Sequence, residues 1–285
     1  MTSQGSELLI LLSANDEDDI SIFNDIGSEL MVIHVGPNQK DIMVHKNLIC
    51  ATGKFFQDMA NNPNGNIGIC SLPNITPEAF KLFLCYIYQR RVPSVNLAAD
   101  PVAQGTRLRE LCQLYSFIEE YGLNVSLLNK TIDSIQDGFR LLDKIPEAPL
   151  IQAIYKNTKA GSKLRKFCAA TTLSAHRSHV FKQESLSKLV KINEDFMEDF
   201  LEAVQGIFWP DADPRIRDCA GDPDCVECHG TCLEGTIRQR RGFWPCYFHV
   251  QPLEVVKVKR EHDGGEKDLD VITLGNKSNC HLWKN

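Results

Sequence analysis

The sequence predicts an α+β fold, with a small sheet near the N-terminus followed by a long series of helices. Short β-branched runs separated by turn residues occupy the first part of the chain, and apolar residues at helical spacing recur throughout the rest. The chain has 285 residues, of which 43% are hydrophobic. It is therefore long enough to bury a core in one large or two modest domains.

The stretch 31–44 predicts a β-hairpin. It contains two apolar, strand-like runs on either side of the turn Gly36-Pro37-Asn38. His45 then opens a helical segment, which Gly53 divides into two short helices. We interpret His45 as a packed, hydrogen-bonded residue at a helix start, and neither as a metal ligand nor as a general base.

A third strand is predicted at residues 67–72, after a turn-rich segment at 61–66. Thr76 and Pro77 then mark a helix start, with Ile75 placed to pack against Phe80. Apolar spacing predicts further helices at residues 108–118, at 125–139 after the cap Asn124, at 150–155, at 164–175 after the cap Ser162, and at 196–204 after the cap Asn193. We interpret the apolar stripe of the last helix as core, with a groove for a partner as the alternative. The stripe consists of Phe196, Met197, Phe200, Leu201 and Val204.

The hairpin and the helices that follow it resemble the BTB/POZ domain. The resemblance rests on Val44-His45-Lys46, on Leu48-Ile49-Cys50-Ala51 and on the pair Phe55-Phe56. It covers residues 29–139 and departs from the family pattern at 91–105, where an insertion replaces a shorter loop. Residues 154–165 look like the helical extension that follows this domain in many fungal proteins.

The sequence therefore divides into four expected segments. These are a partly disordered N-terminal segment at 1–28, a BTB/POZ-like domain at 29–140, a helical extension at 141–208 and a Cys-rich C-terminal segment at 209–285. The resemblance implies a non-enzymatic interaction module or adaptor that binds protein partners and forms homo-oligomers.

Some members of the family also recruit a cullin-type ubiquitin ligase scaffold, partly through a hydrophobic-x-Glu element before the third strand. Residues 59–66 contain no Glu. Weak or absent direct binding to a cullin is therefore expected.

Composition excludes several classes of function. The net charge of −6 and the single basic cluster at residues 238–241 argue against a nucleic-acid partner. No apolar run is long enough to span a bilayer, and residues 8–12 make a poor signal peptide, so an intracellular protein of the cytoplasm or nucleus is expected. No enzyme motif occurs, and His176 and His179 are interpreted as surface residues, so no enzyme activity is predicted.

The C-terminal segment holds six of the eleven cysteines. Cys225 and Cys228 are followed, after seventeen residues, by Cys246 and His249, a spacing that presents four soft ligands to one structural zinc ion. Neighbouring ligand types, which are Cys219, His229, Cys232, Cys280 and His281, leave the choice of ligands open. The alternatives are reduced thiols in a loosely ordered tail and a redox switch. A zinc site would also suit a second function, that of a zinc-stabilised nuclear regulatory protein acting on transcription or chromatin.

Overall fold

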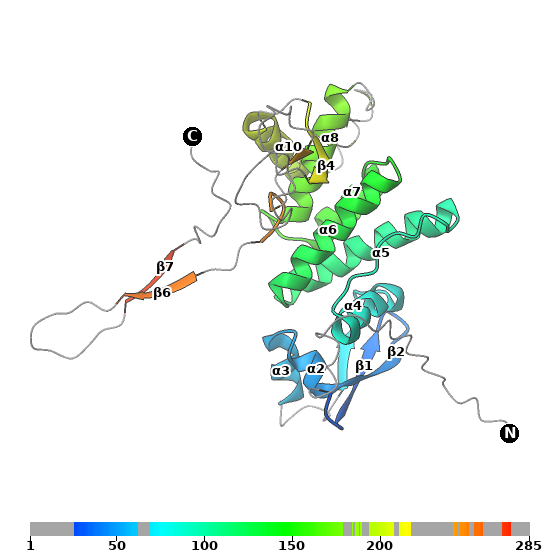
Figure 1. The fold of residues 1–285 in the computed structure, drawn as a ribbon, viewed down its shortest axis with the longest axis vertical. Coiled ribbons are helices and arrows are strands. Elements are labelled where there is room, and N and C mark those ends of the chain that lie inside the picture. The colour runs from blue at the N-terminus through cyan, green and yellow to red at the C-terminus, as the bar shows by residue number, and fades with distance from the viewer. Residues whose placement is uncertain are drawn as a thin grey trace, which may run out of the picture.

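The computed structural model describes residues 26–61, 69–178, 184, 186–187, 189, 194–207, 211–217, 242–243, 246–250, 254–258 and 270–274. A small sheet with two short helices lies at one end, and a set of longer helices extends from it (Figure 1). The predicted α+β class, with a small sheet followed by helices, is therefore confirmed.

The sheet has the strand order β2-β1-β3. Strand β1 (Leu30–Val35) pairs antiparallel with β2 (Lys40–His45), which confirms the predicted hairpin, and parallel with β3 (Ile69–Leu72). The two strands meet at a turn where Gly36 has a φ of 78°, a left-handed conformation that favours glycine. Alternate side chains of β1 point into the core, because successive residues of a strand face opposite sides. The buried ones are Met31, Ile33 and Val35.

Two short helices follow the hairpin, as the sequence predicts. They are α2 (Lys46–Cys50) and α3 (Lys54–Ala60), and Gly53 lies between them. A Cβ atom at Gly53 would lie 3.3 Å from the Cα of Leu123, closer than nine in ten real Cβ contacts. Glycine therefore lets the start of α3 approach the chain that enters the later helices.

Helix α4 (Pro77–Gln89) packs against α2 and α5 and begins as predicted. The hydroxyl oxygen of Thr76 accepts a hydrogen bond from the backbone N–H of Ala79 over 3.3 Å, and Pro77 occupies the first turn. Phe83 of this helix lies at the centre of the core. Its ring centroid is 5.4–5.9 Å from those of three other aromatic residues, which are Phe56, Phe80 and Phe117.

Helices α5 (Pro101–Glu120) and α6 (Val125–Leu141) pack against each other. Asn124 caps α6 as predicted, since its side chain accepts from the Leu127 N–H over 3.2 Å. Helix α5 begins seven residues before the predicted 108, because the Asp100 carboxylate accepts from two backbone N–H groups and Pro101 occupies the first turn. Part of the expected insertion at 91–105 is thus helix rather than loop.

Three more helices form the second half of the described core. They are α7 (Ala148–Asn157), α8 (Lys163–Arg177) and α10 (Glu194–Gly206). The buried side chain of Arg165 on α8 joins them, because it bonds to the Tyr155 carbonyl of α7 and to the Asp195 carboxylate of α10. Ser162 stands at the predicted cap position of α8, but its side chain makes no capping hydrogen bond.

The C-terminal segment contributes two small strand pairs that the sequence reading did not include. Strand β4 (Asp213–Arg217) pairs parallel with β5 (Gly242–Phe243), and β6 (Glu254–Val258) pairs antiparallel with β7 (Asp270–Leu274). Strand β4 packs on α6 and α8. The buried ring of Phe248 lies 5.4 Å from that of Phe167 on α8, so part of this segment shares a core with the helices.

Candidate interaction surfaces

His45 lies where β2 ends and α2 begins. Its backbone N–H donates to the Tyr88 hydroxyl over 3.2 Å, and its ring Nδ1 lies 2.9 Å from the same oxygen. The two rings meet edge to face with centroids 5.8 Å apart. These contacts agree with the interpretation of His45 as a packed residue at a helix start.

The outer side of the sheet carries a small apolar surface, which we call the outer sheet face and define as Leu30, Val32 and Met43. Val32 and Met43 are directly paired across β1 and β2. Leu30 is 53% exposed and Met43 is 69% exposed. Polar contacts border this surface, because the His34 ring lies 2.6 Å from the Asp41 carboxylate and Lys46 forms an ion pair with Glu29 over 3.0 Å. An apolar centre with a polar rim is the usual composition of a protein–protein contact.

A second candidate surface is a groove of about 460 Å³ between α5 and α7, which we call the α5–α7 groove. The connection from β3 to α4 forms part of its wall. Its deepest lining side chains are buried and apolar: Leu108, Cys112, Phe117, Phe139 and Ile154. Its rim is polar and includes Arg109, Gln113, Glu120, Lys144 and Glu147. Ligand pockets in proteins commonly have this size and this distribution of polar groups.

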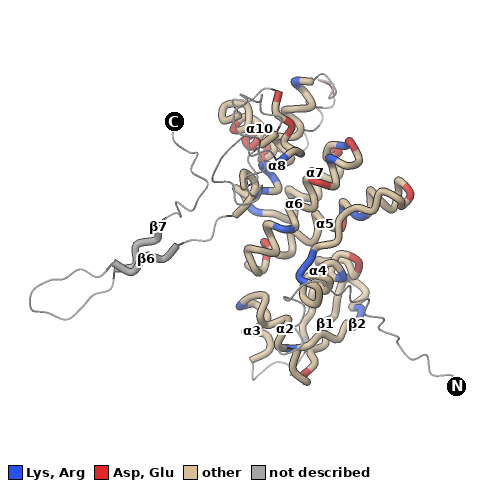
Figure 2. Tube along the Cα trace, in the orientation of Figure 1, with Lys and Arg blue, Asp and Glu red and all other residues tan. Residues whose placement is uncertain are grey.

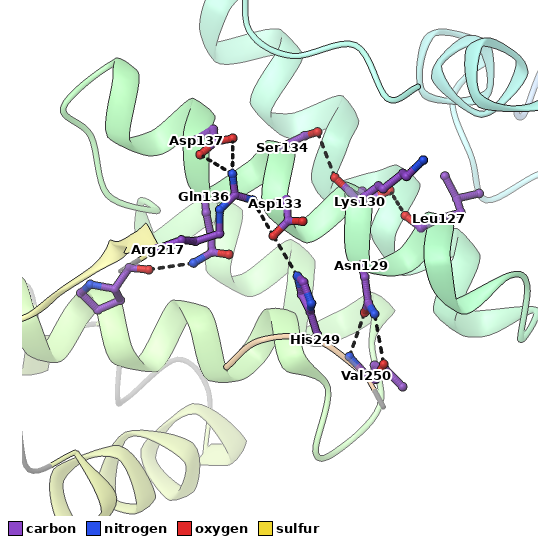
Figure 3. A network of polar contacts seen from close by, with 12 residues as sticks. Leu127, Asn129, Lys130, Asp133, Ser134, Gln136, Asp137, Arg217, His249 and Val250 are labelled. Atoms are coloured by element: carbon purple, nitrogen blue, oxygen red, sulfur yellow. Dashed lines mark hydrogen bonds and ion pairs between the residues drawn. The ribbon is translucent and has the colours of Figure 1, made fainter. Parts of the chain in front are cut away.

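A polar network attaches the C-terminal segments to α6 (Figure 3). The guanidinium of Arg217 bridges two carboxylates one helical turn apart, 2.6 Å from Asp133 and 2.9 Å from Asp137. His249 Nε2 lies 2.9 Å from the same Asp133 oxygen that Arg217 contacts. One turn of α6 therefore binds residues that follow it by 80 positions or more.

Amide side chains of α6 extend this network by bonding to backbone. Asn129 donates to the Val250 carbonyl over 3.1 Å and accepts from the Val250 N–H over 2.8 Å, as a neighbouring strand would. The buried Gln136 donates to the Pro214 carbonyl over 2.9 Å. The two bonds to Val250 satisfy backbone groups that lie outside regular secondary structure.

The carboxylate of Asp137 is only partly compensated in this network. Burial raises the pKa of Asp137 above its ordinary value, and the nearby Arg217 opposes that rise while Asp133 adds to it. The network consequently holds two acidic groups close together on one helix turn, with Arg217 between them. In the described chain these contacts attach Arg217 and His249 of the C-terminal segment to α6.

The structure places two of the four predicted zinc ligands. Cys246 and His249 lie in one turn, since the His249 N–H donates to the Cys246 carbonyl over 3.0 Å. Cys246 is disulfide-bonded, so its sulfur would have to be reduced before it could bind a metal. Cys225 and Cys228 lie outside the described residues. Among the residues that the structure does describe, no group of three or more His, Cys, Asp or Glu is placed to hold a metal ion.

The predicted apolar stripe of α10 divides into two parts. Phe196 and Phe200 are buried in the core, whereas Met197, Leu201 and Val204 are exposed. The core interpretation therefore holds for the two aromatic residues only. The helix also carries five acidic residues and neither Lys nor Arg (Figure 2).

Other predicted features are also placed. His176 is half-buried rather than on the surface, because it lies in the last turn of α8 against the core, and His179 lies outside the described residues. Five described cysteines are free: Cys50, Cys70, Cys85, Cys112 and Cys168. Burial raises the pKa of Cys70 to about 11 and that of Cys112 to about 12, which makes these thiols poor nucleophiles. No helix within the described ranges is long and apolar enough to cross a membrane.

A known family model matches the N-terminal part of the chain. The model of the BTB/POZ domain matches residues 31–121, from the hairpin to the end of α5. No curated protein matches the chain. The match supports a BTB/POZ domain in this part of the chain and a role in protein–protein interaction, which is the general function of such domains. The fungal type of the helical extension stays a prediction.

Proposed function

We propose that this chain is a non-enzymatic adaptor that binds protein partners and self-associates through its BTB/POZ-like part, with the outer sheet face as the contact surface. The match to the BTB/POZ domain supports the interaction role. The exposed side chains of Leu30 and Met43 on adjacent strands are the observation that favours this particular surface.

The outer sheet face suits contact between two copies of the chain. Covering a Met or Leu side chain contributes roughly 1.5–3 kcal/mol relative to leaving it in water. A two-fold contact uses the same surface on both copies, so each of these apolar residues is covered on both copies of the chain. The contact of His34 with Asp41 and the ion pair of Lys46 with Glu29 lie at the edge, where these polar groups keep the free surface hydrated.

The test is the mass of the full chain in solution. We expect light scattering at about 20 μM, a concentration suited to a weak interface, to give the mass of a dimer. Met43→Asp should shift the protein to monomer, because it removes the apolar contact and introduces an unpaired charge into the covered surface. The combined cost is on the order of 3 kcal/mol or more, which corresponds to at least about a hundredfold weaker association.

Val102→Asp provides the matched control. Val102 is 75% exposed, so this variant also replaces an exposed apolar side chain with a carboxylate while leaving the sheet untouched. The control should remain a dimer. A monomeric wild type, or equal behaviour of the two variants, would exclude the outer sheet face as the contact.

Direct binding to a cullin scaffold is proposed to be weak or absent. Helix α3 ends with Met59 and Ala60, and Asn61 follows, so the described start of the loop lacks the Glu that adaptor members use. A submicromolar complex between the full chain and a purified cullin N-terminal domain would show that this departure is unimportant.

A further inference from the structure

We infer that the α5–α7 groove is a docking site for the chain's own apolar run at residues 8–12. This inference does not depend on self-association, because the outer sheet face shares no residue with the groove. The observations that carry it are an unusual glycine in α5, the composition of the groove rim, and the length of chain before the described residues.

Gly105 lies inside the helix α5 and lines the groove. Glycine in a helix interior costs about 1 kcal/mol relative to alanine. No packing requirement within the described fold explains it, since a Cβ atom there would meet nothing within 4 Å. Glycine does, however, let another chain approach the helix backbone closely. The open space above Gly105 would let a bound segment lie against the backbone of α5.

The rim of the groove suits an apolar segment with acidic residues on either side. Arg109 on α5 and Lys144 before α7 both line the groove, and neither forms an ion pair with any residue that the structure describes. The run at 8–12 is Leu-Leu-Ile-Leu-Leu, preceded by Glu7 and followed by the acidic stretch 16–19. Glu120 and Glu147 also line the groove, so we place the run toward its Arg109 end.

The chain is long enough to reach the groove. Fourteen residue steps separate Leu12 from Ile26, where the described structure begins, and an extended chain of that length spans about 46 Å. Val35 lies nine residue steps after Ile26, so the Cα atoms of these two residues are at most about 32 Å apart. Val35 is paired with Leu72 across neighbouring strands, which lie about 5 Å apart. Leu72 lines the groove. The run can therefore reach the wall of the groove at Leu72 without any change in the described fold.

Photo-crosslinking of the full chain tests the occupant. Val102 lies on the groove rim and is 75% exposed, so replacing it with benzoylphenylalanine should crosslink to residues 7–13 of the same chain. The same probe at Leu141, which is 51% exposed and does not line the groove, should not reach that run. Crosslinks to another segment, no crosslink to residues 7–13, or crosslinks only between isotopically light and heavy chains would overturn the assignment.

Hydrogen exchange gives a second, independent readout. Amides of residues 8–12 should exchange at least tenfold more slowly than in an unstructured chain, and Gly105→Trp should abolish this protection by filling the groove. Gly105→Ala leaves most of the groove open but removes the close approach to the helix backbone, so it should reduce the protection without abolishing it. Among charge variants, Arg109→Gln should reduce the protection at least threefold, whereas Glu120→Gln should not. Unprotected amides in the wild type, or protection that survives Gly105→Trp, would refute the inference.

Discussion

Arg165 offers the sharpest test of how the helical extension is held together. Its side chain is 6% exposed and lies over the Tyr155 ring, with the guanidinium carbon 4.6 Å from the ring centroid. It donates to the Tyr155 carbonyl over 2.7 Å, to the Thr158 carbonyl and to the Thr158 hydroxyl over 3.0 Å. Since the last carbonyls of a helix have no partner within it, Arg165 completes the C-terminal end of α7.

The variant Arg165→Met keeps much of the apolar stem but removes every donor. Two buried or half-buried carbonyls then lose a charged partner, at about 1–3 kcal/mol each, and the ring contact is lost as well. The bond to Asp195 adds little, because that carboxylate is 64% exposed and screened by water. We expect a total loss of roughly 3–5 kcal/mol in the free energy of unfolding.

Thermal and urea unfolding of the full chain measure this loss. For a protein of this size the expected decrease in Tm is on the order of 10 °C, with the urea dependence of the free energy unchanged. Asp195→Asn is the control, and it should cost less than about 1 kcal/mol because it removes only the exposed partner. Equal losses for the two variants, or a loss below 1 kcal/mol for Arg165→Met, would refute this account of the α7 end.

Three further predictions concern other parts of the chain. Burial raises the pKa of Asp137 in the folded state above its ordinary value of 3.8, so the folded chain binds more protons than the unfolded chain at a pH just above 3.8. The free energy of unfolding should therefore fall as the pH rises through that window. Arg217→Gln should make Tm fall more steeply with pH, and an unchanged slope would contradict this prediction. The pKa of Cys112 is raised to about 12, so its thiol stays protonated at pH 8 and should resist iodoacetamide until the protein unfolds. Peptide mass spectrometry measures this labelling, and rapid labelling of the folded chain would contradict the prediction. We also propose that Cys225, Cys228, Cys246 and His249 bind one structural zinc ion under reducing conditions. Elemental analysis should find stoichiometric zinc that is lost in a Cys225→Ser, Cys228→Ser double variant, and equal zinc content in both proteins would disprove it.

The N-terminal half of the fold could be predicted because its signals are local. The turn at Gly36, the break at Gly53 and the caps Thr76 and Asn124 each specify backbone geometry within a few residues, and all four are where the sequence places them. The earlier start of α5 was missed, although Asp100-Pro101 is itself a helix-start signature.

The candidate surfaces depended on contacts that sequence spacing does not encode. Periodicity predicts which residues of α10 share a face, but only packing against the other helices separates buried Phe200 from exposed Leu201. Arg165 gave no signal, because its bonds depend on how α8 packs against the C-terminal end of α7. The α5–α7 groove likewise arises from the relative placement of two helices, which no single segment determines.

The central position of β1 has a consequence for the order in which the sheet assembles. Its hairpin partner is next along the chain, but the pair Val32 and Ile69 must close a loop of more than thirty residues, at a higher entropic cost. We expect the hairpin to form first, as the template on which β3 later aligns in parallel. Pulse-labelling during refolding should find the β1–β2 amides protected before those of β3, and simultaneous protection would rule this order out. During synthesis, one edge of β1 should therefore stay unpaired until β3 has left the ribosome.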